Sequence, residues 1–226
     1  MTYTIKSIIE LEELINNREY IDNLTIDMNQ DINHLLSNLT HLTFLKFGFN
    51  IPHILNVGWY YNQLTDLSKL TSLQHLKFGY HYDQFTDLST LTNLTHLEFG
   101  NRYDQITDLS MLSNLQHLQF CNAYSHKCEN LNLSNLQHLE FGWSYNHKIN
   151  LSKLLNLTHL VFGDDYNQLT DLSMLLNLTY LKFGKHNKHY NQPTDLSKCI
   201  KLKQLDDKPI EELDLSIYRN GIFKKN

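Results

Sequence analysis

The heptapeptide LTHLEFG, residues Leu94 to Gly100, contains the pattern that decides the fold. Related heptapeptides end at Gly79, Cys121, Gly142 and Gly163, and each places a histidine three residues before its phenylalanine. From the histidine onward, polar and apolar residues alternate, which is the period of a β-strand. The alternation predicts that Leu97 and Phe99 face a core, whereas His96 and Glu98 face outward.

This strand pattern recurs at a constant interval. The phenylalanines that end it follow one another every 21 residues, at Phe78, Phe99, Phe120, Phe141, Phe162 and Phe183. A strand this short cannot bury its apolar face alone, so successive units must stack into a shared core. The sequence therefore predicts a mainly β repeat solenoid, in which a curved parallel sheet forms one side and turns and short 3₁₀ pieces form the convex side.

The repeat also suggests domain boundaries. We predict an N-terminal cap over residues 1–20, a solenoid over 21–206 and a C-terminal cap and tail over 207–226. Phe47 precedes Phe78 by 31 residues, which indicates an insertion near 49–59, and a shorter insertion falls near 185–189. In the last turn, Leu205 takes the place that Leu181 has in the preceding one.

The rest of each turn has its own expected roles. Gly100 should allow a sharp turn after the strand, and Ile106, Leu109 and Leu112 should return to the core. Asparagines before the strand, such as Asn93, should bond backbone groups at a turn. A tyrosine column at the corner is either a stacked edge whose hydroxyls reach water or the rim of a binding face; it comprises Tyr82, Tyr103, Tyr124, Tyr145 and Tyr166. The turns at 121–135 and 142–152 lose the Thr-Asp-Leu-Ser sequence that should cap the convex segment.

Composition excludes several classes of function. The net charge of −5 over 226 residues gives no reason to expect nucleic acid. No run approaches 18 apolar residues, so no membrane span is expected. The N-terminal residues carry charges and lack the apolar stretch of a signal peptide. Three cysteines, Cys121, Cys128 and Cys199, then predict free thiols in an intracellular protein.

Two segments resemble known repeats. QITDLSML, Gln105 to Leu112, resembles the bacterial internalin type of leucine-rich repeat. FGKHNKHYNQPTDLS, Phe183 to Ser197, resembles the FNIP repeats of amoebae and giant DNA viruses, with Tyr190-Asn191-Gln192-Pro193 in the slot that names that family. The resemblance covers roughly residues 38–197. It implies a leucine-rich-repeat-like fold in an amoebal or viral protein, and a host protein as partner.

The outward positions of the strands are the candidate site. One column holds His75, His96, His117, His138 and His159 and continues to Tyr180; beside it run Lys77, Glu98, Gln119, Glu140 and Lys182. Three interpretations remain open. The columns could be a plain surface ladder, a partner-binding face, or a metal site using His96, Glu98 and His117, or His138, Glu140 and His159. Because an open sheet gives a metal ion no enclosure, we predict no metal ligands and no cofactor.

Catalysis has no candidate centre, because every nucleophile, acid and base is explained by its column. We therefore predict a non-catalytic protein–protein interaction scaffold that binds a partner through the concave strand face. We expect it to act as a monomer inside the cell, in the host cytoplasm if the protein is viral. The alternative is a metal-binding or metal-dependent protein that uses the histidine and glutamate columns.

Overall fold

The computed structural model describes residues 2–17, 20–48, 61–128, 131–184, 190, 192–212 and 222–223. Both insertions that the repeat spacing indicates, near 49–59 and 185–189, lie outside these residues. The chain divides into two compact units, Met1–Leu115 (unit 1) and Gln116–Asn226 (unit 2). The division falls within the predicted solenoid, and the boundaries at residues 20 and 206 stay a prediction.

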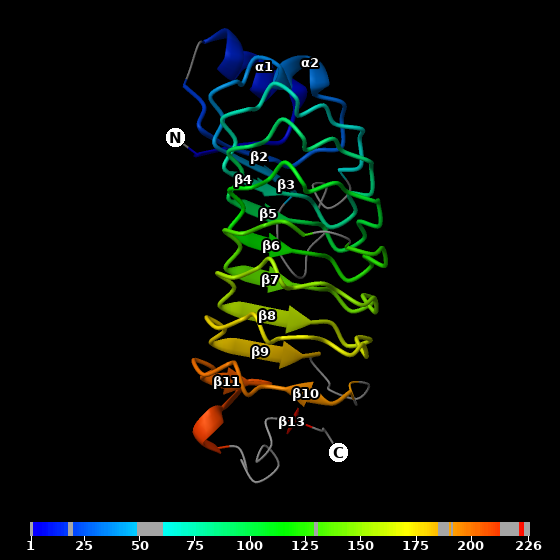
Figure 1. Ribbon diagram of the computed structural model, residues 1–226. Coiled ribbons are helices and arrows are strands. Elements are labelled where there is room, and N and C mark those ends of the chain that lie inside the picture. The colour runs from blue at the N-terminus through cyan, green and yellow to red at the C-terminus, as the bar shows by residue number, and fades with distance from the viewer. Residues whose placement is uncertain are drawn as a thin grey trace. The chain divides into compact units, whose positions relative to one another are not determined.

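Unit 1 is a parallel sheet whose strands follow chain order (Figure 1). Its elements are β1 (Thr2–Ile5), α1 (Ile8–Asn16), β2 (Asn23–Ile26), α2 (Asn33–Leu36), β3 (Phe44–Phe47), β4 (His75–Lys77) and β5 (His96–Glu98). The register pairs equivalent repeat positions, so that Leu45, Leu76 and Leu97 are neighbours across the strands. The strand centres are therefore where the repeat predicts them.

Unit 2 continues the pattern with β6 (His117–Gln119), β7 (His138–Glu140), β8 (His159–Phe162), β9 (Tyr180–Phe183) and β11 (Gln204–Leu205), all paired in parallel. Leu205 pairs with Leu181, as predicted. Two antiparallel pairs complete the unit: β12 (Lys208–Pro209) on β11, and β10 (Thr194–Asp195) with β13 (Ile222–Phe223). A 3₁₀ helix, η2, follows at Ile210–Glu212. Both units are thus built as a parallel-sheet β-solenoid, and the predicted fold class is confirmed.

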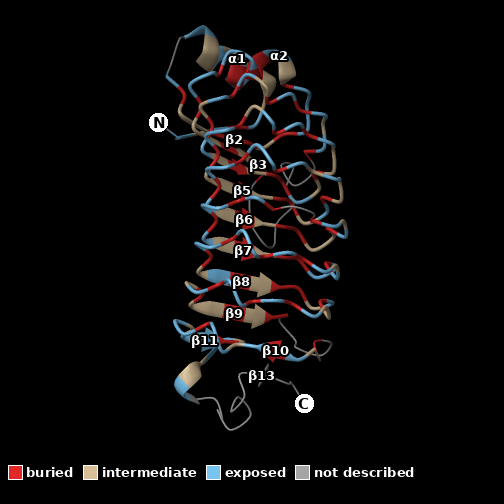
Figure 2. Ribbon diagram, in the orientation of Figure 1, coloured by how far each residue is buried: buried red, intermediate tan, exposed pale blue. Residues whose placement is uncertain are grey.

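The core follows from the alternation within each strand. In β4 to β7 the central leucine is buried and its two neighbours are half-buried. Buried residues recur on every turn of both units (Figure 2). Inside each unit, the phenylalanine of the repeat stacks on its counterpart in the next turn; the Phe78 and Phe99 ring centroids lie 5.7 Å apart. Stacking therefore gives each short strand the apolar cover that it cannot supply itself.

The tyrosine column lies in this core, so the expected exposure of its hydroxyls is wrong. Tyr82, Tyr103 and Tyr145 are fully buried. In Tyr82, Tyr103 and Tyr166 the hydroxyl bonds the threonine four residues later, and the Tyr103 oxygen lies 2.6 Å from Thr107 Oγ1. Tyr61, one turn before Tyr82, makes the same bond to Thr65 Oγ1 at 3.0 Å. Since buried hydroxyls need partners, each tyrosine that is followed by such a threonine requires the threonine to point inward.

That requirement corrects a second expectation. Ile106 is 72% exposed, whereas Leu109 and Leu112 are buried as predicted. Thr107 points inward to meet Tyr103, and in an extended segment adjacent side chains point to opposite sides. Ile106 is therefore turned outward.

The sharp turn expected at Gly100 is present, because the amide of Tyr103 donates to the Gly100 carbonyl at 3.1 Å. Gly100 itself is required for another reason. It does not adopt a left-handed conformation; among the described glycines only Gly48 and Gly184 do. A Cβ on Gly100 would lie 1.7 Å from the carbonyl oxygen of Gly79 in the preceding turn. Glycine is needed here because two turns of backbone approach closely.

Side chains also bond each turn to the one before it. Asn93 and Asn114 donate from Nδ2 to the carbonyls of Thr71 and Thr92, both at 2.9 Å, which confirms the predicted backbone role of these asparagines. On the convex segment, Asp108 Oδ1 accepts from the amide of Ser110. Asn150 does the same for Ser152, so residues 142–152 keep the turn that the missing Thr-Asp-Leu-Ser sequence was expected to remove.

The N-terminal residues form both a strand and a helix. Helix α1 begins after Ser7, whose hydroxyl accepts from the amide of Glu10, while Glu10 accepts from the amide of Lys6. These reciprocal bonds satisfy amides that a helix start leaves unpaired. Leu11 is the fully buried residue of the helix. Among the described residues, no helix is long and apolar enough to cross a membrane.

Candidate functional site

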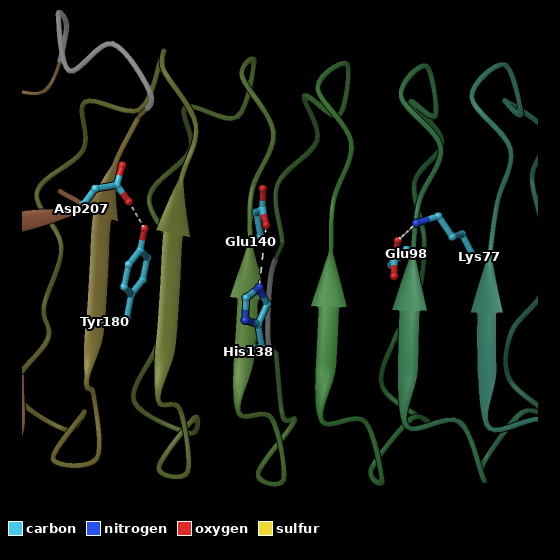
Figure 3. Close-up of polar contacts among 6 residues, drawn as sticks. All are labelled: Lys77, Glu98, His138, Glu140, Tyr180 and Asp207. Carbon is cyan, nitrogen blue, oxygen red and sulfur yellow. Dashed lines mark hydrogen bonds and ion pairs between the residues drawn. The ribbon is translucent and has the colours of Figure 1, made fainter. Parts of the chain in front are cut away.

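The outward positions of unit 1 form a ladder of rings and charges. We call it the unit 1 ladder: Phe44, His75 and His96 in one column, and Lys46, Lys77 and Glu98 in the other. The His75 and His96 rings stack with centroids 4.3 Å apart, and Phe44 lies 5.9 Å from His75. Lys77 and Glu98 form an ion pair between strands β4 and β5 (Figure 3).

Unit 2 presents an equivalent surface. The unit 2 ladder comprises His117, His138, His159 and Tyr180 in one column, and Gln119, Glu140, Val161 and Lys182 in the other. The His117 and His138 centroids lie 4.3 Å apart, and His159 lies 5.6 Å from His138 and 5.7 Å from Tyr180. Every candidate residue thus lies on the outward side of its strand, as the alternation predicts, and the structure brings them together within each unit.

Threonine neighbours fix the tautomer of two ladder histidines. Thr95 Oγ1 lies 3.0 Å from the carbonyl oxygen of Gln74 and 2.9 Å from His96 Nδ1. A carbonyl only accepts, so the single hydroxyl proton goes to Gln74 and Nδ1 must donate to Thr95. Thr158 makes the same two contacts, with Gln137 and His159. In both neutral rings Nε2 is therefore the unprotonated nitrogen, and it is there that acid adds a proton.

Burial and like-charged neighbours make these two rings harder to protonate. Partial burial, reinforced by His75, lowers the pKa of His96 below 6.5, while Glu98 opposes the shift. Partial burial, reinforced by His138, lowers the pKa of His159 in the same way. Stacked imidazoles cannot all carry charge cheaply, since adjacent positive charges repel. His96 and His159 are consequently neutral at pH 7.

Asp207 is a site residue that sequence reasoning placed in the tail. From the turn that joins β11 to β12, its carboxylate accepts from the Tyr180 hydroxyl (Figure 3). The same carboxylate also accepts from the Lys182 ammonium. The turn residues Asp206 and Asp207 both have positive φ, 52° and 65°. Aspartate tolerates that conformation, and a two-residue hairpin turn requires it. The Asp-Asp pair between two short extended segments was the sequence signal that could have predicted this turn.

The metal alternative gains no support from the geometry. His138 Nε2 and Glu140 Oε2 lie 3.8 Å apart on the same strand (Figure 3), but two side chains do not complete a zinc site, which needs at least three protein ligands. In the other candidate set, His96, Glu98 and His117, the carboxylate of Glu98 forms an ion pair with Lys77. Across the described part of the chain, no group of three or more His, Cys, Asp or Glu residues is placed to hold a metal ion.

Comparison with known proteins adds information on the fold. No protein-family model matches the chain, and no curated protein does. CroV588, a circular LRR protein of a giant virus, superposes with a TM-score of 0.58 and 29% identity over 87% of this chain and 34% of its own. Internalin InlF from Listeria monocytogenes gives a TM-score of 0.63 and 22% identity over 90% of this chain and 58% of its own.

The fold is a leucine-rich-repeat-like fold. A third example of it, TLR13 in a complex with ssRNA13, matches with a TM-score of 0.53 and 21% identity over 87% of this chain and 34% of that protein. This leucine-rich-repeat-like chain therefore spans about a third of CroV588 and of TLR13, and 58% of InlF.

Proposed function

We propose that this chain is a non-catalytic scaffold that binds a protein partner through the unit 1 and unit 2 ladders. The observation that carries the proposal is the recurrence of histidine at outward positions of the strands. In β4 to β7 the residues on either side of the central leucine are only half-buried, so their identity is not dictated by the core. Nevertheless, histidine recurs at the first of these positions in every strand from β4 to β8.

The chemistry of the ladders suits a protein surface. Imidazole and phenol rings are flat, amphipathic groups that bury apolar area and still hydrogen-bond, which is why aromatic residues are enriched at interfaces. Charges of both signs stand beside the rings, for example Lys77 with Glu98 and Lys182 with Asp207. A nucleic-acid backbone would instead favour an excess of positive charge. The carboxylates on these faces and the net charge of −5 therefore argue for a protein rather than for RNA such as TLR13 binds.

The setting of the interaction is part of the proposal. The FNIP-like run from Phe183 to Ser197 and the similarity to CroV588 favour an amoebal or giant-virus protein with a host protein as partner. Three cysteines without a disulfide among them, all buried, suit the reducing interior of a cell. We expect the chain to act there as a monomer.

Affinity capture from an amoebal extract tests the proposal. The bait carries a tag without histidines, and captured proteins are identified by mass spectrometry and re-measured as purified partners. The double variant Lys77→Glu, Glu98→Lys swaps the two charges. It keeps the intramolecular ion pair but inverts the order of charges that a partner contacts. Glu140→Lys alters the unit 2 ladder. Lys153→Glu, an exposed charge away from the strands, is the matched control.

Loss of one contacted charge pair should weaken a ladder-bound partner about tenfold, which corresponds to ~1.4 kcal/mol. The control should bind like the unaltered chain. Partners that bind the ladder variants and the control equally well would refute binding through the strand face. A partner whose affinity follows added zinc would instead revive the metal alternative.

A further inference from the structure

Unit 1 carries a second surface that the proposed function does not use. Three large apolar side chains are exposed in successive turns: Leu64 at 63%, Phe85 at 60% and Ile106 at 72%. They are 21 residues apart and occupy the same repeat position, in the segment that returns between strands. We call them the apolar column.

The Tyr–Thr pairs hold this column on the outside. The hydroxyls of Tyr61 and Tyr103 draw Thr65 and Thr107 inward, and the residue before each threonine then points outward. Exposure alternates accordingly: Leu64 is exposed, Thr65 buried, Asp66 exposed and Leu67 buried. The same order recurs at residues 85–88. Outward placement of the column is thus built into the turn.

The fold does not require these positions to be apolar. In unit 2 the equivalent residues of two turns are Lys127 and Lys148, both exposed, in turns where Cys128 and Ile149 replace the threonine of the repeat. A lysine is therefore compatible with this place in the turn. Contiguous exposed apolar side chains on a folded protein commonly mark an interaction site. The choice of leucine, phenylalanine and isoleucine in three consecutive turns calls for a reason other than stability.

A column of carboxylates runs beside the apolar column. Asp66, Asp87 and Asp108 come two residues after the three apolar residues and are exposed on the same outward side. Each Oδ1 accepts from a serine amide two residues later, at 2.9, 2.9 and 2.8 Å. These bonds lower the pKa of all three, so the carboxylates are ionised at neutral pH. The turn itself does not need the charge, because Asn150 makes the same bond to Ser152. We call Asp66, Asp87 and Asp108 the acidic column.

We propose that the apolar and acidic columns of unit 1 bind a cationic amphipathic α-helix of a protein partner. Neighbouring strands of a sheet lie ~4.8 Å apart, and on the returning segments the ring centroids of Tyr61, Tyr82 and Tyr103 are 6.1 and 6.3 Å apart. Along a helix, residues spaced at i, i+3 or i+4, and i+7 recur every ~5.3 Å. Three apolar residues on one face of a helix can therefore meet Leu64, Phe85 and Ile106 in turn, and lysines or arginines along one edge can meet the acidic column.

Charge selects this occupant over two others. A second copy of the chain has a net charge of −5 and would bring like charge to the acidic column. An anionic membrane surface would be repelled for the same reason. A basic helix gains from both columns at once, in the manner of helices that lay an apolar face on a complementary surface. The surface is separate from the ladders, since it lies on the returning segments and not on the strands.

A synthetic Leu/Lys helical peptide with its leucines on one face tests the proposal by fluorescence anisotropy. The chain supplies its own tolerated substitutions. The first variant combines Leu64→Lys, Phe85→Lys and Ile106→Lys, which copies Lys127 and Lys148. The second combines Asp66→Asn, Asp87→Asn and Asp108→Asn, which copies Asn150. The control is Leu169→Lys with Asp171→Asn, the same pair of columns at a single turn of unit 2.

The first variant should lose at least tenfold in affinity for the peptide. The second should also bind more weakly and lose most of its dependence on salt between about 0.05 and 0.3 M. The control should bind like the unaltered chain, and a peptide of equal composition with scattered leucines should bind weakly. Unchanged circular dichroism and melting would show that both variants are folded.

Three results would overturn the proposal. The first is equal peptide affinity for the unaltered chain and the apolar-column variant. The second is self-association of the unaltered chain in sedimentation that the apolar-column variant lacks, because a second copy would then be the occupant. The third is binding to phosphatidylserine vesicles that depends on the apolar column, which would identify a membrane instead. None of these results bears on the proposed function, which is tested separately by partner binding to the ladder variants.

Discussion

The hydroxyl oxygen of Tyr61 lies 3.0 Å from Oγ1 of Thr65, and both groups are buried. Thr65 Oγ1 also lies 2.8 Å from the carbonyl oxygen of Gln63. The threonine proton goes to that carbonyl, so Tyr61 is the donor to Thr65. Four residues after Tyr145, however, the sequence has Ile149, and the Tyr145 hydroxyl is buried with no hydrogen bond to any described residue. The backbone and the thiol of Cys128 lie close enough to act on the pKa of this hydroxyl as weak hydrogen-bonding groups, although neither reaches the geometry of an ordinary hydrogen bond.

Removing these two hydroxyls should have unequal effects on stability. Tyr61→Phe deletes a made hydrogen bond and should cost about 0.5–1.5 kcal/mol. Tyr145→Phe deletes a buried hydroxyl whose contacts with Cys128 are weak, so it should be close to neutral or stabilising. Urea unfolding midpoints of the two variants and the unaltered chain measure the difference. An equal loss from both variants would mean that Tyr145 does have a partner.

Gly163→Ala adds a single methyl group but should destabilise the protein strongly. The added Cβ would lie 1.7 Å from the carbonyl oxygen of Gly142 and 2.5 Å from its carbonyl carbon, so the backbone of one turn must move. Overpacking of this kind typically costs about 1–3 kcal/mol or more. Ser144→Ala, at an exposed corner position of the preceding turn, is the control and should change stability by less than about 0.5 kcal/mol. Thermal melts that shift equally for both would contradict the close approach of the turns.

Stability should fall as pH drops from about 7.5 to 5.5, through the free histidine value of about 6.5. The pKa of His96 and of His159 is lower in the folded chain. The unfolded chain therefore binds more protons in this window, and the free energy of unfolding decreases as pH falls. The carboxylates of Asp66, Asp87 and Asp108, whose pKa lies below 3.8, lose their contribution only at lower pH.

Replacing His96 and His159 by glutamine should flatten this dependence. Part of it should remain, because burial and Arg102 also lower the pKa of His81. Unfolding midpoints at both pH values test the prediction. A double variant with the full pH dependence of the unaltered chain would show that the ladder histidines do not cause it.

The cysteines should be unreactive in the folded protein. All three are buried and free, and burial raises the pKa of Cys128 to about 12 and of Cys199 to about 11. Since the thiolate is the reactive form, a thiol reagent such as dithionitrobenzoate at pH 8 should modify them only after urea is added. Ser144→Cys, which is exposed, should react at once and serves as the control. Fast labelling of Cys128 without urea would contradict its burial.

Sequence periodicity predicted the strands because one repeated pattern governs them. Leu76, Leu97 and Leu139 lie at strand centres, and the histidines lie on the outward face, since the two-residue period of a strand decides both. The returning segment was harder. Ile106 is more apolar than Thr107, and hydrophobicity alone directs it inward. The hydrogen bond from Tyr103 decides otherwise, and a Tyr-x-x-x-Thr spacing repeated at Tyr61 and Tyr82 was the available signal.

For the candidate site, the sequence predicted the positions of the residues but not their contacts. Strand alternation located the ladder residues, but their contacts depend on which rotamers neighbouring strands select. Asp207 joins Tyr180 and Lys182 only because a tight turn reverses the chain after Leu205. That reversal follows turn chemistry and lies outside the 21-residue period.

The side-chain bonds between turns have a consequence for how the protein can change in length. Asn156 reaches the carbonyl of Ser134 and Asn177 that of Leu155, each 22 residues earlier. A duplicated block of 21 residues would bring its own donors and acceptors, so whole turns can be gained or lost by recombination between repeats. The amide of Asn62 still reaches Oδ1 of Asn29 across 33 residues, past the insertion near 49–59. Extra residues between two turns are thus compatible with the side-chain bonds that join those turns.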